Sequence, residues 1–140
     1  MQTLDKPYSV LITDDDRGAR EALRDIVEPA GFRTFLASSG EEAVDIVRES
    51  ETTVHLALFD MHMPRLTGLE TVQLVHQINA LLPCILVTAD ATEDLMRQAF
   101  SVRAYSVIPK PVSPNMLLYT MVRALMKAYG IMPEDDDGIQ

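Results

Sequence analysis

The sequence from Leu56 to Gly68 reads LALFDMHMPRLTG, so four apolar residues lead directly into a carboxylate, Asp60, and then into a loop that contains Pro64. An apolar run this short could belong to a buried helix, but proline and glycine close behind it favour a buried strand followed by a loop. Open α/β sheets bind ligands just beyond the carboxyl ends of their strands. Asp60 is therefore a candidate site residue, although an aspartate here could also only turn the chain or cap the next helix.

Three other predicted strands also end in polar residues. The first is followed by the acidic run 14–16, the fourth ends in Thr88, and the fifth is followed by Lys110 between two prolines. Because the carboxyl ends of parallel strands meet at the same edge of a sheet, we expect acids, a hydroxyl and an ammonium to gather there.

Helical periodicity fills the intervals between the strands. The predicted strands are 8–13, 32–37, 56–60, 84–88 and 105–108. Asp16, Thr92 and Ser113 are expected helix caps, and Ser39 with Glu42 has the S-x-x-E spacing of a capping box. The last helix carries one apolar stripe, made of Leu117, Met121, Ala124, Leu125 and Ala128. Five strands alternating with five helices predict an α/β fold with a parallel sheet covered on both faces.

Composition excludes several classes of protein. The chain has 140 residues, 47% hydrophobic and 24% charged, as in a single soluble globular domain. No apolar run approaches the roughly 20 residues of a membrane span and no signal peptide is evident, so we expect no membrane association and a cytoplasmic location. The net charge of −9, of which −4 comes from residues 134–137, disfavours direct nucleic-acid binding. The one cysteine, Cys84, excludes an internal disulfide and is expected in the core rather than as a nucleophile.

Taken in order, these residues resemble the response-regulator receiver domain of two-component signalling, of the chemotaxis-receiver type. The matching residues are Asp14-Asp15, the Asp-x-x-Met-Pro-x-x-x-Gly loop of Asp60, Met63, Pro64 and Gly68, then Thr88-Ala89, and Lys110-Pro111. The resemblance covers about residues 8–129. It implies a flavodoxin-like five-stranded parallel sheet of order 2-1-3-4-5 flanked by five helices, and a cis Lys110–Pro111 bond. Residues 1–130 would form the receiver domain and 131–140 a disordered acidic tail.

Carboxylates at the strand ends imply a bound cation. Three carboxylates about 5 Å apart repel one another by roughly 3 kcal/mol per pair at an effective dielectric near 20. Oxygen ligands without imidazole or thiolate select Mg²⁺, Mn²⁺ or Ca²⁺. The resemblance implies Mg²⁺, with Mn²⁺ as a substitute. Asp15 and Asp60 would be direct ligands, Asp14 would act through water, and the backbone carbonyl of His62 would complete the set, while Asp16 caps the helix.

The resemblance further implies that Asp60 accepts a phosphoryl group from a sensor histidine kinase or a histidine phosphotransfer protein. Mg²⁺, Lys110, the Thr88 hydroxyl and the Ala89 backbone N–H would stabilise the transferring oxygens. Such a domain is a signalling phospho-acceptor rather than an enzyme. Its phosphorylated surface, on the fourth helix, fifth strand and fifth helix, would bind a downstream output protein or domain, and phosphorylation can also promote dimerisation.

One position departs from the receiver pattern. Receivers often carry Tyr or Phe three residues before the lysine, where this chain has Val107. Tyr105, two residues earlier, is expected on the same face of the sheet at another level.

Alternatives remain beside this interpretation. We expect a stand-alone receiver beginning at Met1, but a fragment of a larger protein with an output domain would look the same. An aspartate-nucleophile phosphatase of the haloacid-dehalogenase type needs a second Asp two residues after the nucleophile, where this chain has His62. A flavodoxin-like electron carrier would have a phosphate loop after the first strand, where this chain has three acids. A pseudo-receiver would lack an acceptor, acid or lysine, and this chain has all three.

Overall fold

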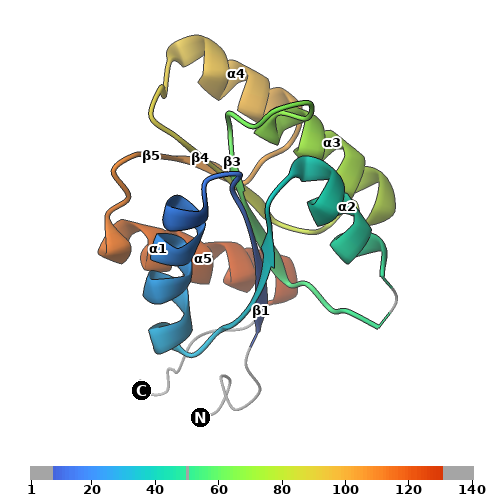
Figure 1. The fold of residues 1–140 in the computed structure, drawn as a ribbon, viewed down its shortest axis with the longest axis vertical. Coiled ribbons are helices and arrows are strands. Elements are labelled where there is room, and N and C mark those ends of the chain that lie inside the picture. The colour runs from blue at the N-terminus through green and yellow to red at the C-terminus, as the bar shows by residue number, and fades with distance from the viewer. Residues whose placement is uncertain (1–7, 50, 131–140) are drawn as a thin grey trace.

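The computed structural model describes residues 8–49 and 51–130, which form one five-stranded parallel sheet in the order β2-β1-β3-β4-β5 (Figure 1). The strands are β1 Ser9–Thr13, β2 Arg33–Ala37, β3 Leu56–Asp60, β4 Cys84–Thr88 and β5 Ser106–Pro109. In the register, Thr13 pairs with Phe59 and Asp60 with Val87, so the carboxyl ends of β1, β3 and β4 lie side by side. The predicted fold class and the implied strand order are both confirmed.

In the described residues, four α-helices and one short 3-10 helix connect the strands, and a fifth α-helix follows β5. They are α1 Arg17–Val27, η2 Glu28–Ala30, α2 Gly40–Arg48, α3 Gly68–Ile78, α4 Glu93–Ser101 and α5 Pro114–Tyr129. Helices α1 and α5 cover one face of the sheet, and α2, α3 and α4 cover the other (Figure 1). Within the described residues, no helix is long and apolar enough to cross a membrane.

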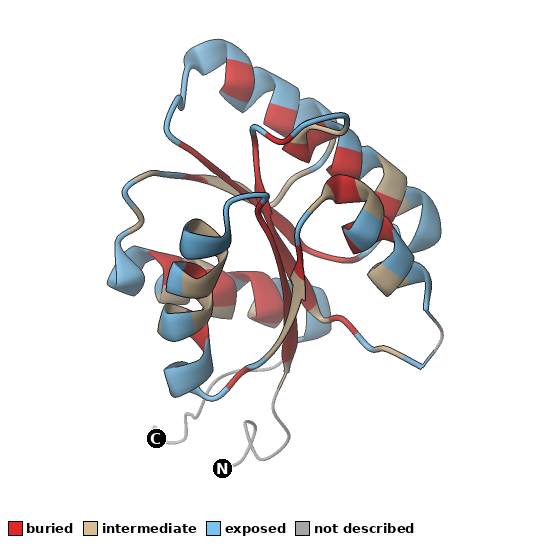
Figure 2. Cartoon of the chain, in the orientation of Figure 1, coloured by how far each residue is buried: buried red, intermediate tan, exposed pale blue. Residues whose placement is uncertain are grey.

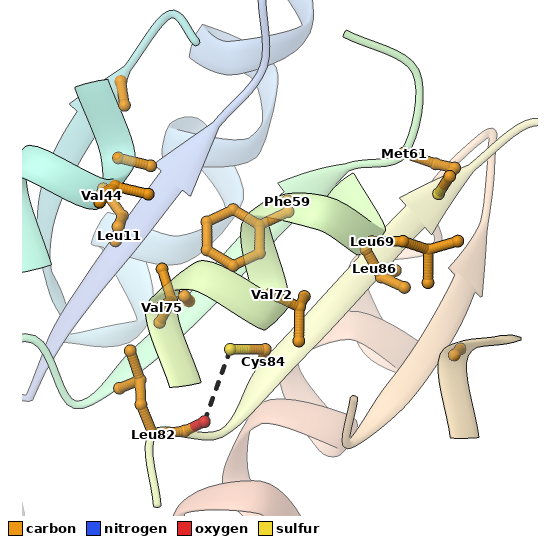
Figure 3. Close-up of a cluster of buried hydrophobic side chains, with 14 of the residues drawn as sticks. Leu11, Val44, Phe59, Met61, Leu69, Val72, Val75, Leu82, Cys84 and Leu86 are labelled. Carbon is orange, nitrogen blue, oxygen red and sulfur yellow. Dashed lines mark hydrogen bonds between the residues drawn. The ribbon is translucent and has the colours of Figure 1, made fainter. Parts of the chain in front are cut away.

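Two hydrophobic layers lie on either side of the central strands, which are buried along their whole length (Figure 2). Phe59 packs among Val72 and Val75 of α3 in the larger layer (Figure 3). Cys84 belongs to the same layer and donates a weak S–H bond to the carbonyl of Leu82 at 3.5 Å. Cys84 is fully buried, which confirms the prediction of a core cysteine, and this burial raises the pKa of its thiol.

Helix caps follow the sequence prediction with one exception. Asp16, Thr92 and Ser113 each accept a bond from the backbone N–H three residues later. The capping box predicted at Ser39 is wrong, because Ser39 accepts from the N–H of Glu42 while the Glu42 carboxylate accepts from the N–H of Ser38. A complete capping box instead begins α3, between Thr67 and Glu70.

The side chains of Tyr105 and Ala128 lie elsewhere than predicted. Val107 packs with the layer under α2 to α4, whereas Tyr105 packs with the layer under α5, on the opposite face. Strand alternation fails here because β5 begins at Ser106 and Tyr105 lies before it. Ala128, predicted in the buried stripe of α5, is exposed. The expectations for residues 1–7 and 131–140 fall outside the described residues.

An aromatic cluster of Tyr8, His55 and Tyr129 lies at the amino-terminal edge of the sheet. Ring centroids of Tyr8 and His55 are 4.8 Å apart, and those of His55 and Tyr129 are 5.7 Å apart. The Ser9 N–H donates to Nδ1 of His55 at 2.9 Å, and the Tyr129 hydroxyl donates to the His55 carbonyl at 2.8 Å. This cluster joins the starts of β1 and β3 to the end of α5, and it holds His55 as the neutral imidazole.

Candidate functional site

Three carboxylates meet at the carboxyl edge of the sheet. Asp14 and Asp15 follow β1, and Asp60 is the last residue of β3. Each offers an oxygen that lies within 4.8 Å of those of the other two. Asp14 and Asp60 are buried, while Asp15 is exposed. The structure therefore brings together the acids that the sequence analysis selected.

Lys110 enters the same cluster from the loop after β5. Its Nζ lies 2.9 Å from Oδ1 of Asp60 and 3.5 Å from Oδ2 of Asp14. Burial alone would lower the pKa of this ammonium, but the hydrogen bond to Asp60 and the charges of both carboxylates outweigh burial and raise its pKa. Lys110 is therefore charged at neutral pH. The Lys110–Pro111 peptide bond is cis, as the resemblance implied.

Asp14 is the most enclosed of the three acids. Its Oδ1 accepts the Asp16 N–H at 2.9 Å, and its Oδ2 faces Lys110. Burial raises the pKa of the Asp14 carboxyl and the charge of Asp60 adds to that rise, against the opposing effects of the Asp16 and Lys110 bonds. Asp14 thus has a protein partner at each carboxylate oxygen.

Thr88 and Ala89 occupy the neighbouring strand end. Thr88 is fully buried, and its hydroxyl oxygen accepts the Asp90 N–H at 3.0 Å. Because the hydroxyl is an acceptor in this bond, its own hydrogen can be donated to a further group. Ala89 is exposed directly after it. The β4–α4 loop is thereby tied to the hydroxyl that the resemblance assigns to the phosphoryl oxygens.

The loop after Asp60 folds back against the carboxyl end of β3. The Gly68 N–H donates to the Met61 carbonyl at 2.9 Å, and a Cβ on Gly68 would lie only 2.7 Å from the Asp60 carbonyl oxygen. Glycine is therefore required where α3 begins beside Asp60. The His62 side chain is exposed at the rim, as expected.

The donors of this cluster fit a hard divalent cation. Among the side chains of Asp14, Asp15, Asp60 and Lys110, three carboxylates against one ammonium leave an excess of two negative charges. Carboxylate oxygens are the ligands that Mg²⁺ and Mn²⁺ prefer, and Mg²⁺ commonly takes one or two of them together with water.

Comparison with known proteins gives the family. The response regulator receiver domain family matches residues 10–122. This chain is a response regulator receiver domain. The receiver is 32% identical over 132 residues to response regulator MprA of Mycolicibacterium vanbaalenii, and 30% identical over 118 residues to transcriptional regulatory protein CpxR of Escherichia coli K12. These alignments cover 94% and 84% of this chain but 55% and 49% of the relatives, so the chain spans about half the length of the curated relatives it matches.

Solved receiver structures have the same fold. A CheY-like receiver domain protein from Methanospirillum hungatei JF-1 superposes with a TM-score of 0.83 at 26% identity, over 89% of this chain and 98% of that one. Chemotaxis protein CheY4 of Vibrio cholerae gives a TM-score of 0.78 at 25% identity, over 84% and 98% of the two chains.

Arg20 is the residue of this receiver's site that sequence reasoning missed. Its Nη1 donates to the backbone carbonyl of Asp14 at 2.7 Å, from the end of the first turn of α1. The signal in the sequence is a basic residue four positions after the Asp16 cap, but the spacing alone does not show which way the side chain turns.

Proposed function

We propose that this receiver accepts a phosphoryl group on Asp60 from the phosphohistidine of a sensor histidine kinase or histidine phosphotransfer protein, in a reaction that requires Mg²⁺. The observation that carries the proposal is the buried Asp60 carboxylate at a strand end, 2.9 Å from Lys110 and within 4.8 Å of two further acids. Asp15, Asp60 and the His62 carbonyl would hold the cation, with Asp14 through water, and Mn²⁺ could replace Mg²⁺.

In the transfer, a carboxylate oxygen of Asp60 attacks phosphorus while the bond from phosphorus to the donor imidazole nitrogen breaks. The electron pair of that bond stays on the imidazole. Lys110 stabilises one phosphoryl oxygen, and the Thr88 hydroxyl with the Ala89 N–H stabilises another. The bound cation supplies further neutralisation of the phosphoryl charge. These groups stabilise charge on the transferring oxygens, which is the main requirement of phosphoryl transfer.

Output is proposed to pass through Thr88 to α4. A Thr88 hydroxyl that turns toward a phosphoryl oxygen changes its bond to the Asp90 N–H, and Asp90 lies in the short loop before the Thr92 cap of α4. The surface of α4 exposes Met96 and Phe100, the latter 85% exposed. On α5, Met116 and Tyr119 are also exposed. These exposed side chains on α4 and α5 support a partner-binding surface on α4, β5 and α5.

Val107 changes how this surface would respond. A valine has one stiff χ1 and no ring to reorient, and Tyr105 packs instead toward α5, where the Lys127 ammonium lies 6.0 Å from its ring centroid. We therefore infer that loop movement beside Thr88, rather than an aromatic rotation in β5, links the site to an output protein or domain.

Intact-mass measurement after treatment with acetyl phosphate and Mg²⁺ tests the proposal. The wild type is expected to gain one phosphoryl group and Asp60→Asn none. Asp16→Asn is the matched control, since asparagine caps a helix as well as aspartate and Asp16 lies next to the site. Equal mass gains in the wild type and Asp60→Asn would remove Asp60 as the acceptor.

A further inference from the structure

Arg20 contacts the backbone that carries two of the acids. Its guanidinium donates to the carbonyl of Asp14 at 2.7 Å, and Asp14 immediately precedes Asp15. The Arg20 side chain is half-buried on α1, and it bonds to a carbonyl rather than to a carboxylate of the cluster.

Three side-chain hydrogen bonds shape the segment 14–16, in addition to two backbone bonds, from the Asp14 N–H to the Ala37 carbonyl at 3.2 Å and from the Arg20 N–H to the Asp16 carbonyl at 3.0 Å. The Asp14 carboxylate accepts the Asp16 N–H at 2.9 Å, the Asp16 carboxylate accepts the Ala19 N–H at 2.8 Å, and the Asp14 carbonyl accepts from Arg20. The bond from the Asp16 N–H ends on the Asp14 carboxylate, whose other oxygen faces Lys110. The bond from the Ala19 N–H is exposed to solvent. Of the three side-chain bonds, only the one from the Arg20 guanidinium uses no carboxylate. A cation that joins the cluster can rearrange the carboxylates without disturbing it.

We propose that Arg20 is a positioning residue, which holds the Asp14–Asp15 peptide so that the exposed Asp15 carboxylate is in place for the divalent cation. The inference rests on the proposed function, because it assumes that Asp15 is a ligand. Groups that orient metal ligands change metal affinity by about 10- to 100-fold when they are removed. Arg20 orients Asp15 through a neighbouring peptide, so its loss should weaken Mg²⁺ binding by about tenfold, at the low end of that range.

The direction in which Mg²⁺ affinity changes on removal of Arg20 distinguishes a positioning role from an effect of its charge alone. A guanidinium near the cluster repels a cation, so if Arg20 acted only through its charge, its removal would tighten Mg²⁺ binding. A positioning role predicts weaker Mg²⁺ binding when Arg20 is removed.

Arg24→Ala is the matched control. Arg24 lies one turn further along α1 and pairs with Asp25 at 3.7 Å, so its removal changes the net charge equally without touching Asp14.

The experiment combines calorimetric titration with Mg²⁺ and metal-free amide hydrogen exchange of Asp16, for the wild type, Arg20→Ala, Arg20→Lys and Arg24→Ala. We expect Arg20→Ala to bind Mg²⁺ about tenfold more weakly and to exchange the Asp16 amide faster. Arg24→Ala should match the wild type, and Arg20→Lys should fall between.

Equal or tighter Mg²⁺ binding by Arg20→Ala, or an unchanged Asp16 exchange rate, overturns the positioning role. If Arg20→Ala fails to fold, Arg20→Lys is judged by the same two measurements, with weaker binding and faster exchange as the expected result. A wild type that binds no Mg²⁺ refutes the metal site of the proposed function itself, which is a different result from a wild type and an Arg20→Ala variant that bind equally well.

Discussion

Replacing Asp60 with asparagine is expected to stabilise the metal-free protein. The Asp60 carboxylate lies 2.9 Å from the Lys110 ammonium but within 4.8 Å of the carboxylates of Asp14 and Asp15. At an effective dielectric near 20, the attraction amounts to about 6 kcal/mol, and each repulsion to at least about 3.5 kcal/mol. The two repulsions together exceed the attraction by about 1 kcal/mol. Burial of the Asp60 charge adds to this cost, and an asparagine carbonyl can still accept the Lys110 bond.

Thermal unfolding followed by circular dichroism measures the effect. In the presence of a chelator, Asp60→Asn should melt roughly 3 °C above the wild type, as about 1 kcal/mol corresponds to a shift of this size in a domain of this length. Added Mg²⁺ should reverse the order, because a ligand at 100 times its Kd stabilises the folded wild type by about 2.7 kcal/mol while the variant has lost a ligand. Asp16→Asn, at an exposed cap, should leave both melts unchanged.

A lower melting temperature for Asp60→Asn in chelator would refute this reasoning. It would mean that the Lys110 ammonium more than balances the acidic cluster, and that the resting site needs no further cation.

Three further predictions concern separate parts of the chain. Asp15→Ala should weaken Mg²⁺ binding more than Asp14→Ala, because a direct ligand is lost in one case and a contact through water in the other. Calorimetric titration measures both affinities, and a larger loss of affinity for Asp14→Ala contradicts the assignment. Lys110→Ala should still bind the phosphoryl mimic beryllofluoride but fail to shift the amide resonances of α4, β5 and α5, since its charge-assisted bond to the mimic is missing. Wild-type shifts in Lys110→Ala would show that the surface change does not need Lys110. Burial lowers the pKa of His55, so below the ordinary histidine pKa of about 6.5 the unfolded chain binds a proton that the folded protein resists. The free energy of unfolding in urea should therefore fall more in the wild type than in His55→Gln as the pH drops from about 7.5 to about 5.5, and equal losses would exclude this contribution.

The strand ends could be predicted because two independent sequence patterns indicate them. Each central strand is an apolar run that stops at a polar residue, as at Asp60 and Thr88, and the intervals between strands have the length and period of helices. The pairing order has no such local signal, since any order satisfies the same pattern. It followed only from the resemblance to receivers.

Several contacts depended on geometry that spacing does not contain. The S-x-x-E spacing does not show that the Glu42 carboxylate accepts from the Ser38 N–H and not from the Ser39 N–H. Alternation along β5 says nothing of Tyr105, because the strand starts one residue later. The bond from Arg20 to the Asp14 carbonyl depends on how α1 is rotated about its own axis relative to β1. The capping box of Thr67 and Glu70, by contrast, has its T-x-x-E spacing in the sequence, but a predicted helix that starts at about Leu69 leaves Thr67 in the loop.

The buried sulfur of Cys84 makes this chain convenient for site-specific labelling. Cys84 is the single cysteine of the sequence, and its thiol is fully buried and stays protonated at neutral pH because burial raises its pKa. Thiol reagents attack exposed thiolates, so a cysteine introduced in place of Phe100 on α4 or Met116 on α5 would react alone, with the native cysteine kept. A pair of spin labels at these two positions would then report the distance between α4 and α5 in the resting and phosphorylated protein, without any change to the core.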